Sequence, residues 1–267
     1  MKTFSSDIYK FSLSSKIALF LTALFAAAGF TWPFFAPDLA SARFAQYFFW
    51  IAMPLAFILL LTQLSDRSLD AKSVALLGII AALLAALRPL GAGAVGLEPM
   101  WFLLILAARV FGSAFGFLLG ALGMLASALF TGGIGPWLTY QIFAAGVVGL
   151  FAGAFARELR GWREQVYLVF IAIISALSYG LLMDLQFWPW ALGANTQLSF
   201  IAGGDLASNL QRFFAFHFLS SMAWDIPRAI LTSVLVFSAG PAVLSALRRA
   251  RKRAAFLTPI EFSERLS

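Results

Sequence analysis

The sequence predicts an all-α fold, a polytopic helical bundle embedded in a membrane. Hydrophobic residues make up 61% of the 267 residues, charged residues 12%, and the mean hydropathy is +0.89. Soluble globular proteins have about 45–50% apolar and about 25% charged residues. The apolar residues form long continuous runs, which indicates helices, because a membrane β-barrel needs short alternating segments. With no cysteine and a single histidine, His217, disulfides, thiolate catalysis and multi-histidine metal sites are excluded.

Eight apolar segments are predicted to span the membrane, most of them close to the roughly 20 residues that a helix needs. Residues 17–36 follow three lysines, as a signal peptide would, but the apolar run continues to Phe35 and predicts an uncleaved anchor. The short segment 98–111 is expected to form a hairpin with 113–131. The eight segments are 17–36, 43–64, 73–90, 98–111, 113–131, 136–157, 164–188 and 226–247.

Basic residues predict the orientation, because they crowd the cytoplasmic flanks of spans. With the N-terminus inside, all but four of the 19 lysine and arginine residues face the cytoplasm; the four are Arg43, Arg88, Arg212 and Arg228. We therefore expect a multi-pass plasma-membrane protein with both termini inside and residues 89–97, 131–136 and 189–208 outside. The net charge of +7 follows from this asymmetry, so no nucleic acid partner is expected, and "RRARKR" at 248–253 is expected to meet anionic membrane lipid.

Three stripes of small residues at four-residue spacing indicate close helix contacts. Those at Gly112, Gly116 and Gly120 and at Ala145, Gly149 and Gly153 are expected to pack within the molecule. The stripe Gly78, Ala82 and Ala86 is widened by Ala81 and Ala85 into an alanine face. This face suits either internal packing or a contact with another protein.

Polar and aromatic residues gather at the predicted outer ends of the spans, where a binding site for a small molecule is expected. Ionisable residues within spans usually face a cavity or a partner. Asp225 and Arg228 lie three residues apart, so they could pair on one helix face or contact a ligand, and tryptophans such as Trp188 are also typical of the membrane interface. The candidate substrate-binding residues are Arg88, Glu98, Trp137, Tyr140, Gln141, Trp188, Trp224, Asp225 and Arg228. No catalytic residue, metal site or cofactor is predicted.

The chain contains no GxxxxGK[ST] phosphate-binding loop, so a transporter of this kind needs an ion gradient or ATP hydrolysis by another subunit. Three stretches of the sequence resemble the substrate-binding S components of energy-coupling factor (ECF) transporters, particularly an actinobacterial branch. They are "SVALLGIIAALLAALRPLGAG", "EPMWFLLILAARVFGSAFGFLLGALGMLASALFTGGIGPW" and "WDIPRAILTSVLVFSAGPAVLSALRRARKR".

The resemblance implies a six-helix vitamin-binding core at 72–253, an N-terminal extension with two further spans at 1–71, and a cytoplasmic tail at 254–267. It implies a T component and two ATPase subunits as partners, with Ala81, Ala82, Ala85 and Ala86 docking on the T component. It also implies that the external loop, "ALRPLGAGAVGLEPMW", closes over the substrate, with Gly91, Gly93 and Gly96 as hinges. The branch favours cobalamin or a related large cofactor as substrate.

Two other classes of function stay open at this point. One is a membrane-embedded enzyme, which would need convergent acids or a bound ion in one cavity. The other is a gradient-driven permease, which an inverted internal repeat would favour; the sequence shows no such repeat.

Overall fold

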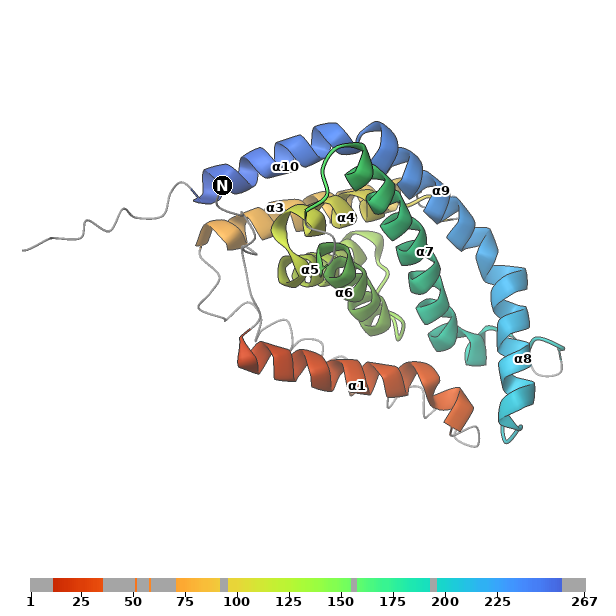
Figure 1. The fold of residues 1–267 in the computed structure, drawn as a ribbon. Helices are drawn as coiled ribbons and strands as arrows, with labels where there is room; N and C mark the ends of the chain where they lie inside the picture. The colour runs from red at the N-terminus through yellow and green to blue at the C-terminus, as the bar shows by residue number, and fades with distance from the viewer. Residues whose placement is uncertain are drawn as a thin grey trace, which may run out of the picture.

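The computed structural model describes residues 12–35, 71–91, 96–154, 158–192 and 196–255, together with positions 51 and 58. The predicted span 43–64 and the loop glycine Gly93 lie outside these residues. The described part is helical and has no strand, so the all-α prediction is confirmed (Figure 1). The helices are α1 (Leu13–Phe35), α3 (Ala71–Leu87), α4 (Met100–Phe111), α5 (Ser113–Thr131), α6 (Leu138–Ala154), α7 (Trp162–Ala191), α8 (Leu206–Phe216), α9 (Met222–Ser238) and α10 (Gly240–Ala255).

Four of the described helices are long and apolar enough to cross a membrane: α1, α3 with the 3₁₀ turn Arg88–Gly91, α5 and α7. Helix α7 has 30 residues and is about 45 Å long. A fifth span results if Leu206–Ser238 and Gly240–Lys252, which meet at an angle of 69°, count as one. Helices α4 and α6 are apolar but shorter, so 98–111 does not form a full-length span.

The predicted last span, 226–247, is wrong in its boundaries. The structure has a long helical stretch in its place, Leu206–Ser238, which includes a π-helical turn at His217–Ser221, and α10 then leaves at the bend. Pro241 follows Gly240, and proline disfavours a continuous helix at the residue before it, which explains the break inside an apolar run. At the other end, Asp205 caps α8 by accepting from the backbone N–H of Ser208 at 2.9 Å. Hydrogen bonds from Ser208 hold the pKa of Asp205 below its usual value.

Helices α5 and α6 form the most intimate pair of the bundle. A Cβ atom at Gly116 would overlap the carbonyl oxygen of Gly149, and one at Gly149 would overlap that of Gly116. Gly120 meets the carbonyl of Ala145 in the same way. The prediction that these two stripes pack within the molecule is confirmed, because only glycine lets the two backbones touch here.

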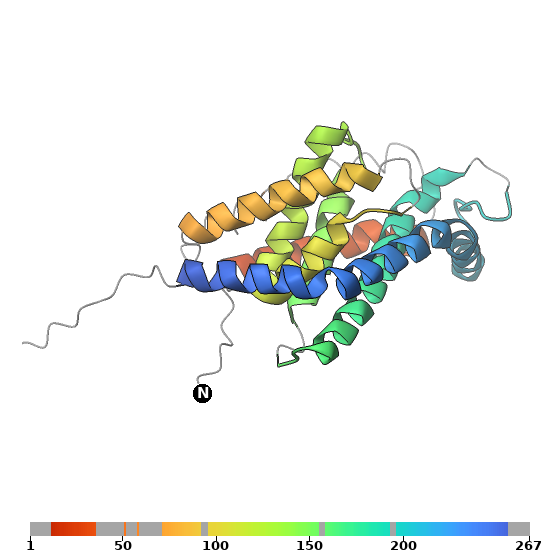
Figure 2. The same cartoon turned by 90° about the horizontal axis from the view of Figure 1, so that it is seen from above.

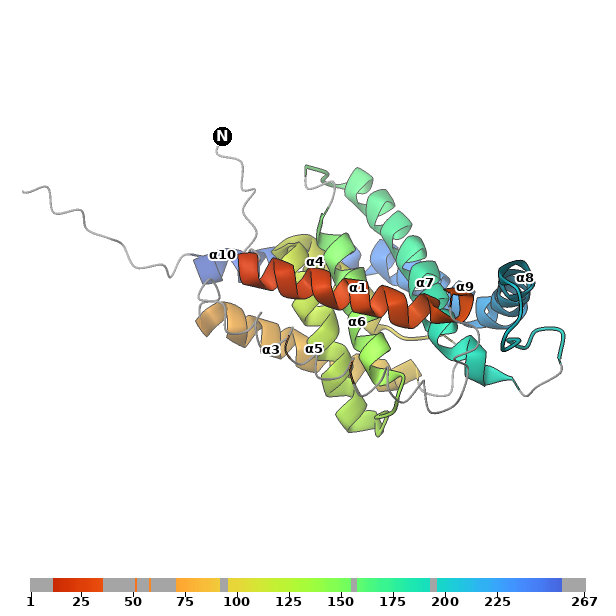
Figure 3. The same cartoon turned by 90° about the horizontal axis from the view of Figure 1, so that it is seen from below.

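Helices α1 and α10 lie on opposite sides of α5 and α6 (Figures 1 and 3). Helix α1 contacts α7 and α8 through aromatic rings, among them Trp32 against Trp190 at 5.6 Å and Phe34 against Trp188 at 6.0 Å between centroids. Helix α10 packs on α9 and α4, which the view from above shows (Figure 2).

Candidate substrate-binding site

A cavity of about 520 Å³ opens where the end of α3, the starts of α4 and α6, the second half of α7 and the start of α9 come together. Seven of the nine predicted site residues line it: Arg88, Glu98, Trp137, Gln141, Trp224, Asp225 and Arg228. Its size lies within the range of about 300–1,000 Å³ that is typical of small-molecule sites. The sequence alone could not place these side chains together, because they come from four separate parts of the chain: the turn after α3, the segment before α4, the start of α6, and α9.

Arg88 connects three helices at one wall of the cavity. Its Nη1 donates to the hydroxyl of Ser127 at 2.9 Å and its Nη2 to Oε1 of Gln141 at 3.3 Å. Its Nε lies 3.8 Å from Oε1 of Glu98. The guanidinium therefore donates hydrogen bonds to two other side chains of the protein, which fixes its position.

A second ionic group forms the wall at the start of α9. Arg228 donates from Nη1 to Oδ1 of Asp225 at 2.6 Å, and its Nε lies 3.5 Å from Oε2 of Glu98. The indole of Trp101 donates to the same Glu98 oxygen at 2.8 Å. The guanidinium also lies 5.1 Å from the ring centroid of Tyr179, a cation–π contact. Asp225 and Arg228 thus pair with each other and also line the cavity.

Tyr140 and Trp188 lie away from this cavity. Tyr140 packs edge-on against Phe30 of α1, and a Cβ atom at Gly29 would come within 2.9 Å of its hydroxyl. Trp188 is 1% exposed and donates from its indole to the carbonyl of Leu198 at 2.7 Å. Tyr140 thus packs α1 against the core, and Trp188 does the same for the segment before α8. The sequence did not separate them from the site residues, because it does not show the helix rotation that decides which face they occupy.

One face of α7 contributes residues that were absent from the predicted site. These are Tyr179, Gly180, Met183, Asp184 and Phe187, whose spacing follows one side of a helix. Asp184 accepts from or shares a proton with Nδ1 of His217 at 2.5 Å, and His217 is buried. The contact with Asp184 satisfies this ring nitrogen, which fits a structural role for His217. Asp184 was a usable signal, because an ionisable residue within an apolar span usually faces a cavity or a partner.

Gly91 and Gly96, two of the predicted hinge glycines, lie where the backbone passes very close to another segment. A Cβ at Gly91 would overlap the carbonyl of Leu97, and one at Gly96, where φ is +69°, would overlap the carbonyl of Trp224. The chain at Gly96 therefore lies directly on α9 in a backbone conformation that favours glycine. At both positions, the absence of a side chain lets another backbone segment come very close.

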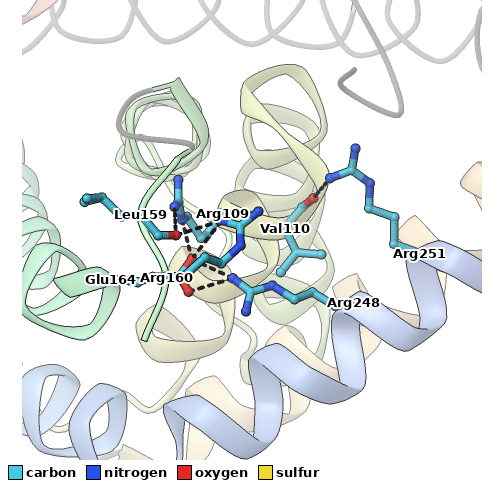
Figure 4. Close-up of polar contacts among 7 residues, drawn as sticks. All are labelled: Arg109, Val110, Leu159, Arg160, Glu164, Arg248 and Arg251. Atoms are coloured by element: carbon cyan, nitrogen blue, oxygen red, sulfur yellow. Dashed lines mark hydrogen bonds and ion pairs between the residues drawn. The ribbon is translucent and has the colours of Figure 1, made fainter. Parts of the chain in front are cut away.

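A second cluster of charges lies at the other end of α4 and α7. Glu164, 2% exposed, accepts from Nε of Arg109 at 2.8 Å and from Nη2 of Arg248 at 2.6 Å. Figure 4 shows these guanidiniums and that of Arg160 converging on the carboxylate, while Arg251 donates to the carbonyl of Val110 at 2.7 Å. The cluster joins α10 to α4 and to the start of α7.

Of the four residues of the predicted docking face, two are buried. Ala81 and Ala85 are 6% and 0% exposed and pack inside the bundle, whereas Ala82 and Ala86 are exposed. Ala75 and Gly78 are exposed on the same side, and no atom lies within 4 Å of a Cβ built at Gly78. The exposed ridge of α3 therefore consists of Ala75, Gly78, Ala82 and Ala86.

An apolar helical bundle with a cavity walled by charged, polar and aromatic side chains is typical of a membrane-embedded protein that binds a small molecule. Residues 68–215 match the sequence model of the family described as "ECF-type riboflavin transporter, S component". This match covers more than half of the chain, and the chain belongs to that family. It is thus a multi-pass membrane protein and the substrate-binding subunit of an ECF transporter, not an enzyme. Neither the curated proteins nor the solved structures contain a match.

Proposed function

We propose that this chain captures riboflavin in the cavity between α3, α4, α6, α7 and α9 and delivers it through an ECF T component driven by two ATPase subunits. The observation that carries the proposal is the cavity itself, which combines the ionic groups of Arg88 and Arg228 with the indoles of Trp137 and Trp224. Aromatic walls suit a flat ring system, and a few fixed polar groups suit its hydrogen-bonding edge. The description of the family names riboflavin.

The cobalamin-like ligand favoured by the sequence receives no support from the family match. A corrinoid with its nucleotide loop is much larger than a flavin, and a cavity of about 520 Å³ suits the smaller molecule better.

The two remaining predicted site residues take a different place in this proposal. Tyr140 and Trp188 contact α1 and the segment before α8, so they would affect substrate binding only through the stability of the core.

The proposal predicts that riboflavin binds to the purified protein and that Trp137→Ala weakens this binding. An aromatic contact contributes about 0.5–1.5 kcal/mol beyond its buried area, so the dissociation constant should rise by about two- to tenfold. Quenching of riboflavin fluorescence measures the affinity. Trp162→Ala is the matched control, because Trp162 is an exposed tryptophan at the opposite end of α7.

Two results of this titration would contradict the proposal. One is the absence of riboflavin binding to the unmodified protein. The other is displacement of riboflavin by an equimolar amount of cobalamin, which would make the larger molecule the favoured substrate.

The exposed ridge of α3, formed by Ala75, Gly78, Ala82 and Ala86, is proposed as the surface that meets the T component. Small residues let helices approach closely in lipid, and this ridge has no covering element among the described residues. Ala81 and Ala85 are no longer part of the proposed surface, because the core of the bundle covers them.

A further inference from the structure

Asp225 is the most deeply buried acid of the cavity wall, with 1% of its surface exposed. Its Oδ1 accepts the hydrogen bond from Arg228. Its Oδ2 is also buried, but it accepts no hydrogen bond from any residue that the structure describes. A buried acceptor without a donor is unfavourable, so such atoms are rare in proteins unless something else supplies the donor.

Gly180 explains how the carboxylate reaches this position. A Cβ atom at residue 180 would overlap both carboxylate oxygens and the Cγ atom of Asp225. The carboxylate thus lies directly against the backbone of α7, in a niche that only glycine leaves open. Glycine within a helix is less stable than alanine, so its presence in the middle of α7 fits a need for this space.

We propose that Oδ2 of Asp225 accepts a hydrogen bond from an N–H or O–H group of the substrate, and that Gly180 is the positioning residue for this acceptor. Arg228 holds the other oxygen and supplies the opposite charge, which keeps the acceptor fixed. The site then selects flat aromatic molecules that carry an N–H or O–H donor over those that lack one. This inference rests on the proposed binding of riboflavin.

The first test compares two ligands on the full chain: riboflavin, and 3-methyllumiflavin, whose ring N–H is methylated and whose hydroxylated chain is replaced by a methyl group. Asp225→Asn keeps the side-chain volume, and its amide oxygen is expected to turn to Arg228, so the NH₂ group replaces the acceptor. The dissociation constant of riboflavin should rise by about ten- to a hundredfold, and that of 3-methyllumiflavin should stay within about twofold.

An equal loss for both ligands would overturn the role of Asp225 as an acceptor for the substrate. Failure of the unmodified protein to bind riboflavin is a different result, because it contradicts the proposed function itself.

The second test asks whether Gly180 acts through Asp225. Gly180→Ala alone should weaken riboflavin binding about as much as the loss of Asp225, because its methyl group displaces the carboxylate. In the Asp225→Ala background the overlap is gone, so Gly180→Ala should change the dissociation constant by less than about twofold. Gly78→Ala is the control, since residue 78 faces open space on α3.

A further loss caused by Gly180→Ala in the Asp225→Ala background would overturn the positioning role, as would normal binding by Gly180→Ala alone. Thermal unfolding of each variant, measured without ligand, separates these results from a general loss of structure.

Discussion

At the scale of single residues, the protein keeps buried charges in two places and balances them differently. In the cavity, Asp225, Arg228 and Glu98 form a group in which one carboxylate oxygen has no donor among the residues that the structure describes. Around Glu164, by contrast, both carboxylate oxygens accept from arginines. A charge removed from water is stable only when partners satisfy it, so the first group suits binding and the second suits structure.

The Glu164 cluster gives a prediction at this scale. Glu164→Ala should lower the stability of the protein by about 3–5 kcal/mol, because it leaves a buried charge without its partner. The side chain of Arg109 is only 3% exposed and loses the carboxylate that it contacts at 2.8 Å. Thermal unfolding in detergent measures the change.

Glu158→Ala is the matched control for this prediction. Glu158 is exposed, and surface substitutions usually change stability by less than about 0.5 kcal/mol. Equal unfolding temperatures for the two variants would show that the cluster contributes nothing to stability. Riboflavin binding by the folded fraction of Glu164→Ala should stay normal, because Glu164 does not line the cavity.

At the scale of elements, hydropathy predicted which segments form helices better than it predicted their ends. The segment 113–131 coincides with α5, because Gly112 and Gly132, with φ angles of 104° and 64°, stop the helix at both ends. The segment 226–247 failed, because the polar residues of α8 hid the first half of a long helical stretch. Hydropathy averages over side chains, so it cannot detect a helix whose apolar face covers only part of its circumference.

For the candidate site, the sequence predicted the residue types but not the helix faces that carry them. Polar and aromatic types at the ends of spans were enough to find seven of the residues that line the cavity. They were not enough to exclude Tyr140 and Trp188, because these residues have the same chemistry and differ only in the helix face that carries them. For the same reason, the predicted docking face of α3 was only partly right: Ala81 is buried in the bundle, whereas Ala82 is exposed.

The ridge of α3 gives the prediction at the scale of elements. The double variant Ala82→Trp, Ala86→Trp should abolish co-purification with the T component and the ATPases, because large indoles hold apart two helices that small residues let touch. Riboflavin binding should stay within about twofold, since neither residue lines the cavity. Affinity purification of the co-expressed subunits measures assembly.

Ala27→Trp controls for the effect of an added indole, because Ala27 is exposed on α1, on another part of the surface. Normal assembly of the α3 double variant would contradict the proposed docking ridge. Loss of assembly in both variants would show that the indole acts in some way other than through α3.

At the scale of the whole molecule, the two charged clusters lie at opposite ends of the same helices. Glu98 and Arg109 are separated by the length of α4, and Glu164 and Asp184 by about 30 Å along α7. Helix α9 begins at the cavity, and α10, which follows it at a 69° bend, is tied to Glu164 through Arg248. The cavity and the α10 cluster are thus connected by a continuous path of packed helices.

Because the two clusters lie at opposite ends of the bundle, the orientation of the protein in the membrane predicts which cluster faces the cytoplasm. The excess of basic residues near α10 and the start of α7 predicts that the Glu164 end lies in the cytoplasm and that the cavity faces the outside. The chain has no cysteine, so single substitutions give a signal without background. Gln197 and Glu158 suit the test, because both are exposed and they lie at opposite ends of α7.

In intact cells, a membrane-impermeant maleimide should label the protein with Gln197→Cys and leave the protein with Glu158→Cys unlabelled until the membrane is permeabilised. The reason is that residue 197 precedes α8 near the cavity end, while residue 158 lies beside the arginines that contact Glu164. The opposite labelling pattern would invert the molecule and place the cavity on the cytoplasmic side, where it could not collect riboflavin from outside. Labelling of both positions in intact cells would indicate damaged membranes, which an impermeant dye added to the same cells detects.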